Sequence, residues 1–196
     1  MKAFLLAALM GSTATAAFAE AETYLIDPGH SQAVISYNHA GFSTTQALLS
    51  GWEGEISFDA EAPENSSVTA TIPAERLYTG WQARDEHFLQ SGDFFDLEAN
   101  PTVSFTSTGI EVTGENTAQI TGDLTLNGVT KPVVLDAVLN STTDAYPFPP
   151  NEGKKAMGID ASTTVVRSEY NLGLFAPFVG DELSVEISIE AVAQDG

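Results

Sequence analysis

Residues 183–191 read Leu183-Ser184-Val185-Glu186-Ile187-Ser188-Ile189-Glu190-Ala191, with apolar residues at odd positions and polar residues at even ones. Successive side chains of a β-strand point to opposite faces of its sheet, so this alternation predicts a strand with one apolar and one solvent-facing side. Strands of this kind build antiparallel sheets that cover a core with one face.

The same period of two recurs along most of the chain. It is seen in residues 33–39, 52–58, 68–72, 102–106, 120–126 and 157–165. Together these segments predict about eight to ten strands, without the alternating helices that a parallel sheet requires. Residues 81–90 are the one good helix candidate and are followed by Gly92. An all-β fold follows, either a closed barrel or a sandwich.

Two further details bear on the predicted architecture. Asn127-Gly128 separates two apolar runs and predicts a hairpin, whose loop we expect to exceed two residues because Pro132 cannot donate to a central ladder. The inward face mixes large residues with small ones at Gly54, Ala70, Gly122 and Ala161. These small residues either leave room for a ligand or fit the taper of a filled core.

The N-terminus has the pattern of an export signal. Lys2 precedes an apolar run, and Ala17-Phe18-Ala19 forms an A-x-A cleavage site before Glu20. We therefore expect residues 1–19 to be a removed signal peptide and residues 20–196 to form a single exported domain. The chain has no cysteine, so no disulfide framework is expected.

The formal charge of −20 excludes whole classes of partner. Twenty-seven acidic residues face seven lysines and arginines, so nucleic acid would be repelled. Such a charge is typical of a solvated outer surface that keeps a protein soluble. No stretch after the signal is long and apolar enough to span a bilayer, so stable membrane insertion is not expected.

Candidate chemical groups are few. His30, His39 and His87 lack the close spacing typical of a metal site, and His39 lies on the apolar face of its strand, so we expect no metal. Ser31 and Ser168 stand beside histidine or near acids but lack a G-x-S-x-G elbow, so no catalytic residue is assigned.

Arginines are the remaining candidates. Arg167 shares the parity of an inward face, so it is expected to be paired or hydrogen-bonded. Arg84, Asp85 and Arg167 could form an ion-paired cluster with Asp27 or Asp96 and so anchor the predicted helix and the Phe94-Phe95 pair. Alternatively, Arg167 could contact a polar group of a ligand, such as a carbonyl or a pyrophosphate.

Four blocks of sequence resemble the YceI-like domain family. They are Tyr24-Leu25-Ile26-Asp27-Pro28-Gly29-His30-Ser31 with His39; residues 54–59; Arg84-Asp85-Glu86-His87 through Asn100-Pro101-Thr102-Val103-Ser104-Phe105; and residues 122–132 with Val166-Arg167-Ser168-Glu169-Tyr170 and Val179-Gly180-Asp181-Glu182. Asn171 stands where the family usually has glycine, and Tyr146-Pro147-Phe148-Pro149-Pro150 is a local elaboration that could affect ligand access.

The resemblance implies a fold and a ligand. The fold would be an extended antiparallel, lipocalin-like barrel with about eight strands and one short helix near residues 81–90. The ligand would be a polyisoprenoid lipid, such as an isoprenoid quinone, held in the periplasm by a monomer or homodimer without a cofactor. Each methylene removed from water would contribute about 0.8 kcal/mol. Alternatives are an enzyme that acts on such a lipid with His87, Asp85 and Arg84, and a stress-linked interaction protein.

Strand parity and the apolar loop after Asn171 give the residues expected to contact the lipid. They are Ile35, Tyr37, Trp52, Ile56, Phe58, Val103, Phe105, Leu124, Leu126, Leu135, Ile159, Val165, Arg167, Leu174, Phe175 and Phe178. The loop of residues 172–179 and the Tyr146–Pro150 segment could each cover the mouth of the cavity.

Overall fold

The predicted antiparallel barrel with one short helix is confirmed by a computed structural model, which describes residues 21–194. The signal-peptide prediction falls on residues 1–19, outside the described part of the chain. The strands are β1 (Glu22–Ile26), β2 (Gln32–His39), β3 (Ser43–Ser50), β4 (Glu53–Phe58), β5 (Ser67–Pro73), β6 (Leu77–Tyr78), β7 (Thr102–Val112), β8 (Thr117–Leu126), β9 (Val129–Thr143), β10 (Ala156–Val166) and β11 (Glu182–Ala193). The α-helix α1 spans Gln82–Gln90, and short 3₁₀ turns lie at Pro63–Asn65, Ala74–Arg76 and Arg167–Tyr170.

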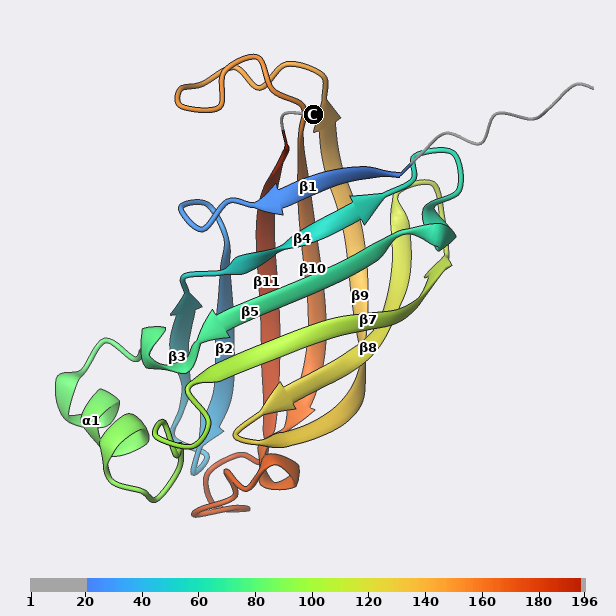
Figure 1. Ribbon diagram of the computed structural model, residues 1–196. Helices are drawn as coiled ribbons and strands as arrows, with labels where there is room; N and C mark the ends of the chain where they lie inside the picture. Colours follow the sequence, from blue (N-terminus) through green and yellow to red (C-terminus); the bar gives the residue numbers. More distant parts are fainter. Residues whose placement is uncertain (1–20, 195–196) are drawn as a thin grey trace, which may run out of the picture.

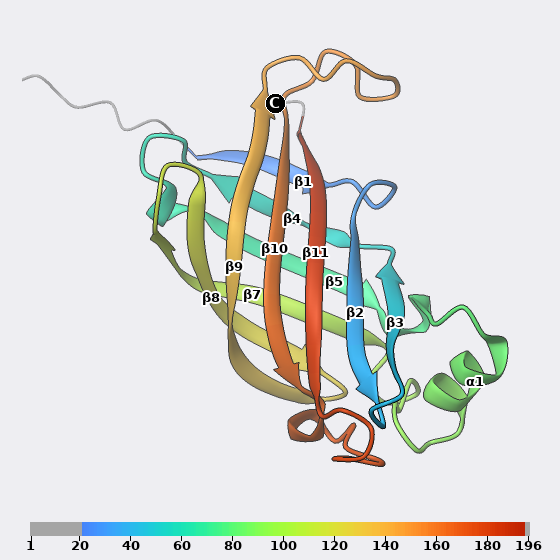
Figure 2. The ribbon, with the colours of Figure 1, turned by 180° about the vertical axis from the view of Figure 1, so that it is seen from behind.

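Eight strands close the barrel. They follow the order β1-β4-β5-β7-β8-β9-β10-β11, and β1 pairs with β11 to complete the ring. β11 pairs with two strands on the same edge, because Ala191–Ala193 pair with β1 whereas Ser184–Ser188 pair with β2. The ribbon β2-β3-β6 therefore extends the wall where β1 ends (Figures 1 and 2).

The two ends of the barrel differ. At one end lie α1, the turn between β2 and β3, and the loop before β11, whereas the β9–β10 loop projects from the opposite end (Figure 1). Near that opposite end, a cluster of Tyr24, Ile56, Met157, Ala191 and Ala193 fills the interior. Toward the helix end a larger apolar cluster, which includes Leu126 and Leu172, packs against Phe94 and Phe95, although no residue of α1 itself is buried.

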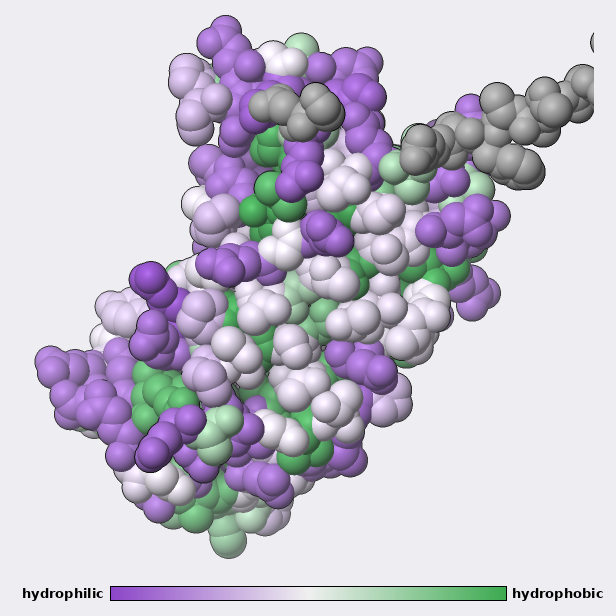
Figure 3. All heavy atoms as spheres, viewed as in Figure 1, coloured by the Kyte–Doolittle hydropathy of each residue, from purple (hydrophilic) through white to green (hydrophobic). Residues whose placement is uncertain are grey.

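The outer surface carries the polar half of each alternating strand (Figure 3). In β11 the even-numbered Glu182, Ser184, Glu186 and Ser188 are exposed while the odd-numbered side chains up to Ile189 face inward. Among residues 21–194, no helix is long and apolar enough to cross a membrane.

The Asn127-Gly128 hairpin is tighter than expected. Leu126 pairs directly with Val129, so the loop has only two residues, both with positive φ. Pro132 pairs with Asp123 of β8 on one side, but the pairing of β9 with β10 begins only at Asp136. The expected longer loop is therefore wrong, since Pro132 lies where β9 and β10 have separated and no ladder donor is required.

The small inward residues have two different roles. Ala70 and Ala161 line the interior space. Gly122 does not, because a Cβ there would come within 2.3 Å of the Phe105 ring, which covers it. Gly54 has φ +151° and a Cβ would approach the Thr69 carbonyl oxygen to 2.1 Å, so it permits close contact between strands.

Candidate ligand-binding cavity

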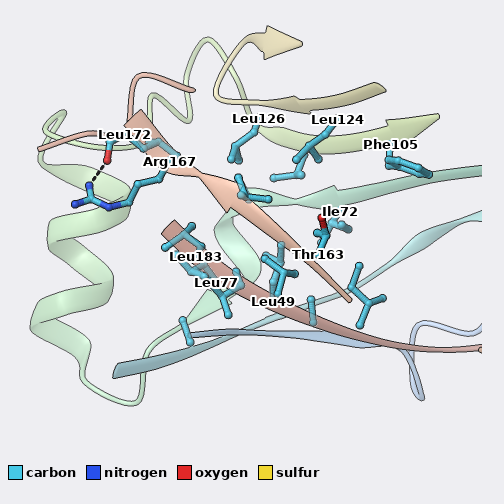
Figure 4. A pocket seen from close by; sticks show the side chains of 18 of the residues that line it. Leu49, Ile72, Leu77, Phe105, Leu124, Leu126, Thr163, Arg167, Leu172 and Leu183 are labelled. Atoms are coloured by element: carbon cyan, nitrogen blue, oxygen red, sulfur yellow. Dashed lines mark hydrogen bonds between the residues drawn. The ribbon is translucent and has the colours of Figure 1, made fainter. Parts of the chain in front are cut away.

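A long apolar cavity occupies the barrel interior and reaches the α1 end. Its volume is about 570 Å³, within the roughly 300–1,000 Å³ typical of ligand pockets. Aliphatic side chains from opposite walls face one another across it, among them Leu49, Ile72, Leu124 and Leu183 (Figure 4). Among residues 21–194, no aspartate or glutamate lines it.

Most residues expected to contact a ligand lie on the cavity wall. Those on the wall are Ile35, Tyr37, Trp52, Ile56, Val103, Phe105, Leu124, Leu126, Leu135, Ile159, Val165, Arg167 and Phe175. Their contact with a ligand stays a prediction.

Three expected residues lie off the wall. Phe58 packs with the apolar cluster near the opposite end, beyond the cavity. Phe178 projects outward with 81% of its surface exposed, and Leu174 is also at the surface, so neither lines the cavity. Alternation predicts which side of a strand faces inward but not how far the cavity extends along that strand. The loop of residues 172–179 has no regular alternation, so its side chains could not be placed in this way.

Several wall residues were not among the expected set. The inward side chains of β11 line the cavity, although the alternation of that strand was recognised. The others lie near strand ends, in α1 or in the connector, the segment between α1 and β7. They include Ile26, Leu49, Ile72, Leu77, Leu183, Val185, Ile187, Phe88, Phe94 and Phe95. Parity could have found the strand residues, whereas the connector phenylalanines have no periodic signal.

Helix α1 covers one side of the mouth and is held by polar contacts. Asp85 Oδ1 accepts hydrogen bonds from the Thr79 backbone N–H at 2.8 Å and from Thr79 Oγ1 at 2.6 Å. His87 Nε2 lies 3.1 Å from Asp93 Oδ2, and its ring meets Phe94 edge-on at 5.3 Å. These contacts fix the helix to the segments on either side of it.

Arg84 makes no ion pair in the described part of the chain. Its guanidinium lies over the Trp81 ring, 5.6 Å from the ring centroid. The expected ion-paired cluster of Arg84, Asp85 and Arg167 with Asp27 or Asp96 is therefore wrong. Asp27 instead lies 2.9 Å from His30 Nδ1, and this contact raises the pKa of the exposed His30.

Arg167 holds the loop of residues 171–181 rather than α1. Nε donates to the Gly180 carbonyl at 2.8 Å and Nη2 to the Val179 carbonyl at 2.9 Å. Nη1 donates to the carbonyl of Leu174 and to that of Leu172, the bond drawn in Figure 4. Burial lowers the pKa of Arg167, and the charge of nearby Asp181 opposes this shift. An arginine with four carbonyl partners is well suited to fixing a loop.

The remaining polar candidates have local roles. Ser31 Oγ donates to the Glu190 carbonyl, and Ser168 Oγ donates to Asp181 Oδ2 at 2.6 Å, which lowers the pKa of that carboxyl. His39 and His87 line the cavity, whereas His30 does not. Within residues 21–194, no three histidine or acidic side chains gather in a metal-binding arrangement.

Two sequence departures are also placed by the fold. Asn171 adopts the left-handed conformation, with φ +60°, at the end of the 3₁₀ turn. The Tyr146–Pro150 segment lies in the β9–β10 loop, at the end opposite α1 (Figure 1). The interpretation that it could cover the cavity mouth is therefore wrong.

The matched family model and the similar proteins indicate the same family. The YceI-like domain matches residues 24–191. A UPF0312 protein of Pseudomonas savastanoi pv. phaseolicola is 36% identical over 191 residues, covering 95% of this chain and 96% of that protein. Another, from Ectopseudomonas mendocina, is 33% identical and covers 99% of this chain and 100% of its own length.

Solved structures share the barrel. The Campylobacter jejuni YCEI protein has a TM-score of 0.70 and 26% identity, over 79% of this chain and 88% of that one. Burkholderia cenocepacia BcnA has a TM-score of 0.73 at 19% identity, over 84% and 98%. A polyisoprenoid binding domain from Saccharophagus degradans has a TM-score of 0.61 at 12% identity, over 89% and 99%. From the domain match and these relatives, the chain belongs to the YceI-like family.

Proposed function

We propose that this protein binds an isoprenoid-type lipid in its barrel and carries or stores it in the periplasm, without catalysis and without a cofactor. The observation that supports this most is the composition of the cavity wall, which is aliphatic and aromatic along the barrel and polar mainly near α1. The lipid would place its tail in the barrel and its head near the mouth. The polyisoprenoid-binding description of a structural neighbour agrees with this ligand class.

The energetics favour a long unbranched or methyl-branched tail over a compact polar ligand. Each methylene transferred from water to the cavity contributes about 0.8 kcal/mol, so about ten buried carbons outweigh a typical ordering cost of several kcal/mol. A polar ligand would lose its hydration without finding partners along the barrel.

Extraction of the protein as purified tests the proposal. We expect organic extraction and mass spectrometry to recover an unmodified isoprenoid lipid in about equimolar amount. A lipid-free protein that converts an added isoprenoid into a product would instead favour the enzyme, with the His87–Asp93 pair as the candidate proton-transfer group.

Leu124→Glu gives the first specific prediction. The substitution would place a carboxylate against an apolar wall, so we expect loss of bound lipid or a fall in melting temperature. Thr121→Glu, on the exposed face of the same strand, is the matched control and should retain both. A Leu124→Glu protein that matches the control in both lipid content and melting temperature would contradict the assigned cavity.

The periplasmic location has its own test. If residues 1–19 are an export signal, N-terminal sequencing of protein recovered from the periplasm should begin at Glu20. Protein that retains Met1 and stays in the cytoplasm would contradict the location but leave the lipid site standing.

A further inference from the structure

Large apolar side chains are exposed on two neighbouring loops of the barrel. Phe42, in the turn between β2 and β3, is 90% exposed, and Phe178, in the loop before β11, is 81% exposed. Leu174 and Phe175 of the same loop are also exposed. We call these four residues the apolar rim. Both loops lie at one end of the molecule (Figure 1), and apolar atoms are visible at the lower tip in Figure 3, where the loop before β11 lies.

Backbone contacts hold the two loops together. The loop before β11 bridges to the end of β2 through Val179 and His39, one residue away from Phe178 and three away from Phe42. Four carbonyls of the same loop accept hydrogen bonds from Arg167. The exposed phenylalanines therefore project from backbone that is already ordered, so binding through them would cost little conformational entropy.

Phe175 joins the rim to the interior. Its side chain lines the cavity and is also 55% exposed, so apolar surface continues from the cavity wall to the outside of the barrel. Its φ is +65°, in the left-handed region that bulky residues rarely adopt. Glycine would relieve this strain, so an aromatic side chain here is better explained by binding than by stability.

The two loops carry no charge in a protein that is otherwise strongly acidic. Residues 38–45 and 171–180 contain no aspartate, glutamate, lysine or arginine, although 27 of the 196 residues of the chain are acidic. Without acids, the loops can enter an apolar phase without dehydrating a charge. Without lysine or arginine, they have no attraction for an anionic surface. The partner that fits them is therefore apolar and carries no net charge.

We propose that the apolar rim docks this protein onto a lipid bilayer with zwitterionic head groups, with Phe42 and Phe178 entering the interface. This inference rests on the proposed binding of a lipid and adds the surface from which the lipid is taken. A tail that left the cavity into water would expose its methylenes again, whereas a rim pressed against a bilayer lets it pass between two apolar phases. The contact is peripheral and involves only side chains of the two loops.

Flotation with phosphatidylcholine vesicles tests the docking. We expect the purified protein to float with these vesicles. At low ionic strength less of it should float when part of the phosphatidylcholine is replaced by phosphatidylglycerol, because the formal charge of −20 is repelled. Phe42→Ser combined with Phe178→Ser should weaken the partition about tenfold, since two phenyl rings no longer leave water.

Two controls separate docking from folding and from lipid uptake. Phe148→Ser replaces an exposed phenylalanine of the β9–β10 loop, at the opposite end of the barrel, and should float as the parent does. Neither Phe42 nor Phe178 lines the cavity, so the double variant should take up geranylgeraniol added in ethanol as the parent does. Its melting temperature should also be unchanged, because both replaced side chains are exposed.

Each contrary result has a distinct meaning. A parent protein that does not float but takes up geranylgeraniol would overturn the docking and leave the proposed function standing. Equal flotation of the parent and the double variant would overturn the role of the rim. A parent that is dimeric, becomes monomeric in the double variant and does not float would show that a second copy covers the rim, against the membrane. A protein that floats through the rim but takes up no geranylgeraniol would support the docking and contradict the proposed function.

Discussion

Arg167 is the residue that most clearly links sequence, packing and the mouth of the cavity. Arg167 continues the inward-facing positions of β10, so its side chain is buried in the barrel wall. A buried guanidinium needs hydrogen-bond partners for its N–H groups. Four carbonyls of the loop between Leu172 and Gly180 provide these partners. One side chain thereby organises a loop that has no regular structure of its own.

Removal of Arg167 should therefore cost stability and loosen this loop. We expect Arg167→Ala to lower the free energy of unfolding by about 2–4 kcal/mol, because several charge-assisted hydrogen bonds from a buried guanidinium to backbone carbonyls are lost. Arg167→Lys keeps the charge but lacks the planar fork, so its loss should be intermediate. Thermal melts check both, and an Arg167→Ala protein as stable as the parent would contradict the anchoring role.

At the scale of elements, the tight hairpin between β8 and β9 reaches beyond its own strands. Asn127 Oδ1 accepts from the Asp96 N–H at 3.1 Å, and Asn127 Nδ2 donates to the carbonyls of Phe94 and Tyr170. A Cβ at Gly128 would meet Asn100 Oδ1 at 2.6 Å. The turn residues thus dock the connector after α1 onto the barrel.

Asn127→Gly isolates this docking from the turn itself. Glycine accepts the positive φ of the position, so the hairpin should persist while the side-chain bonds disappear. We expect a loss of about 1–2 kcal/mol of unfolding free energy and faster hydrogen exchange at the Asp96 amide. Asn127→Asp is the comparison, because its carboxylate can still accept from Asp96 but cannot donate. Unchanged exchange in the glycine variant would show that the connector is held by other contacts.

The elements also show what could be predicted from sequence. Alternation identified the inner faces of β2, β8 and β10, and the helix at residues 81–90 begins at Gln82 in the structure. Phe58 was misplaced because parity gives a side but not a depth, and Arg167 was assigned the wrong partner because loop carbonyls leave no signal in sequence. The two-residue hairpin was missed because the local separation of β9 from β10, which accommodates Pro132, depends on the whole barrel.

At the scale of the molecule, apolar clusters lie toward both ends of the barrel, and the cavity is bordered by their side chains. Tyr24 and Met157 pack near one end, and Leu126 and Leu172 pack with Phe94 toward the other. Stability should therefore come mainly from the strand ladders and these clusters, while wall positions that border the empty space should tolerate added volume better than a filled core would. This separation allows binding and stability to be varied independently.

Ala161→Phe tests that separation. Ala161 lies on the cavity wall on β10, opposite Ala137 and Ile187 on the neighbouring strands. A phenyl ring there would occupy space that a lipid tail needs, so we expect bound lipid to fall severalfold while the melting temperature of the lipid-free protein stays the same or rises. Ser188→Phe, on the exposed face of β11, is the control and should keep its lipid. If Ala161→Phe keeps a full complement of lipid, the tail does not reach this part of the barrel. If it unfolds the protein, the interior is a filled core at this depth, since overpacking is costly only where neighbouring atoms have no room to move.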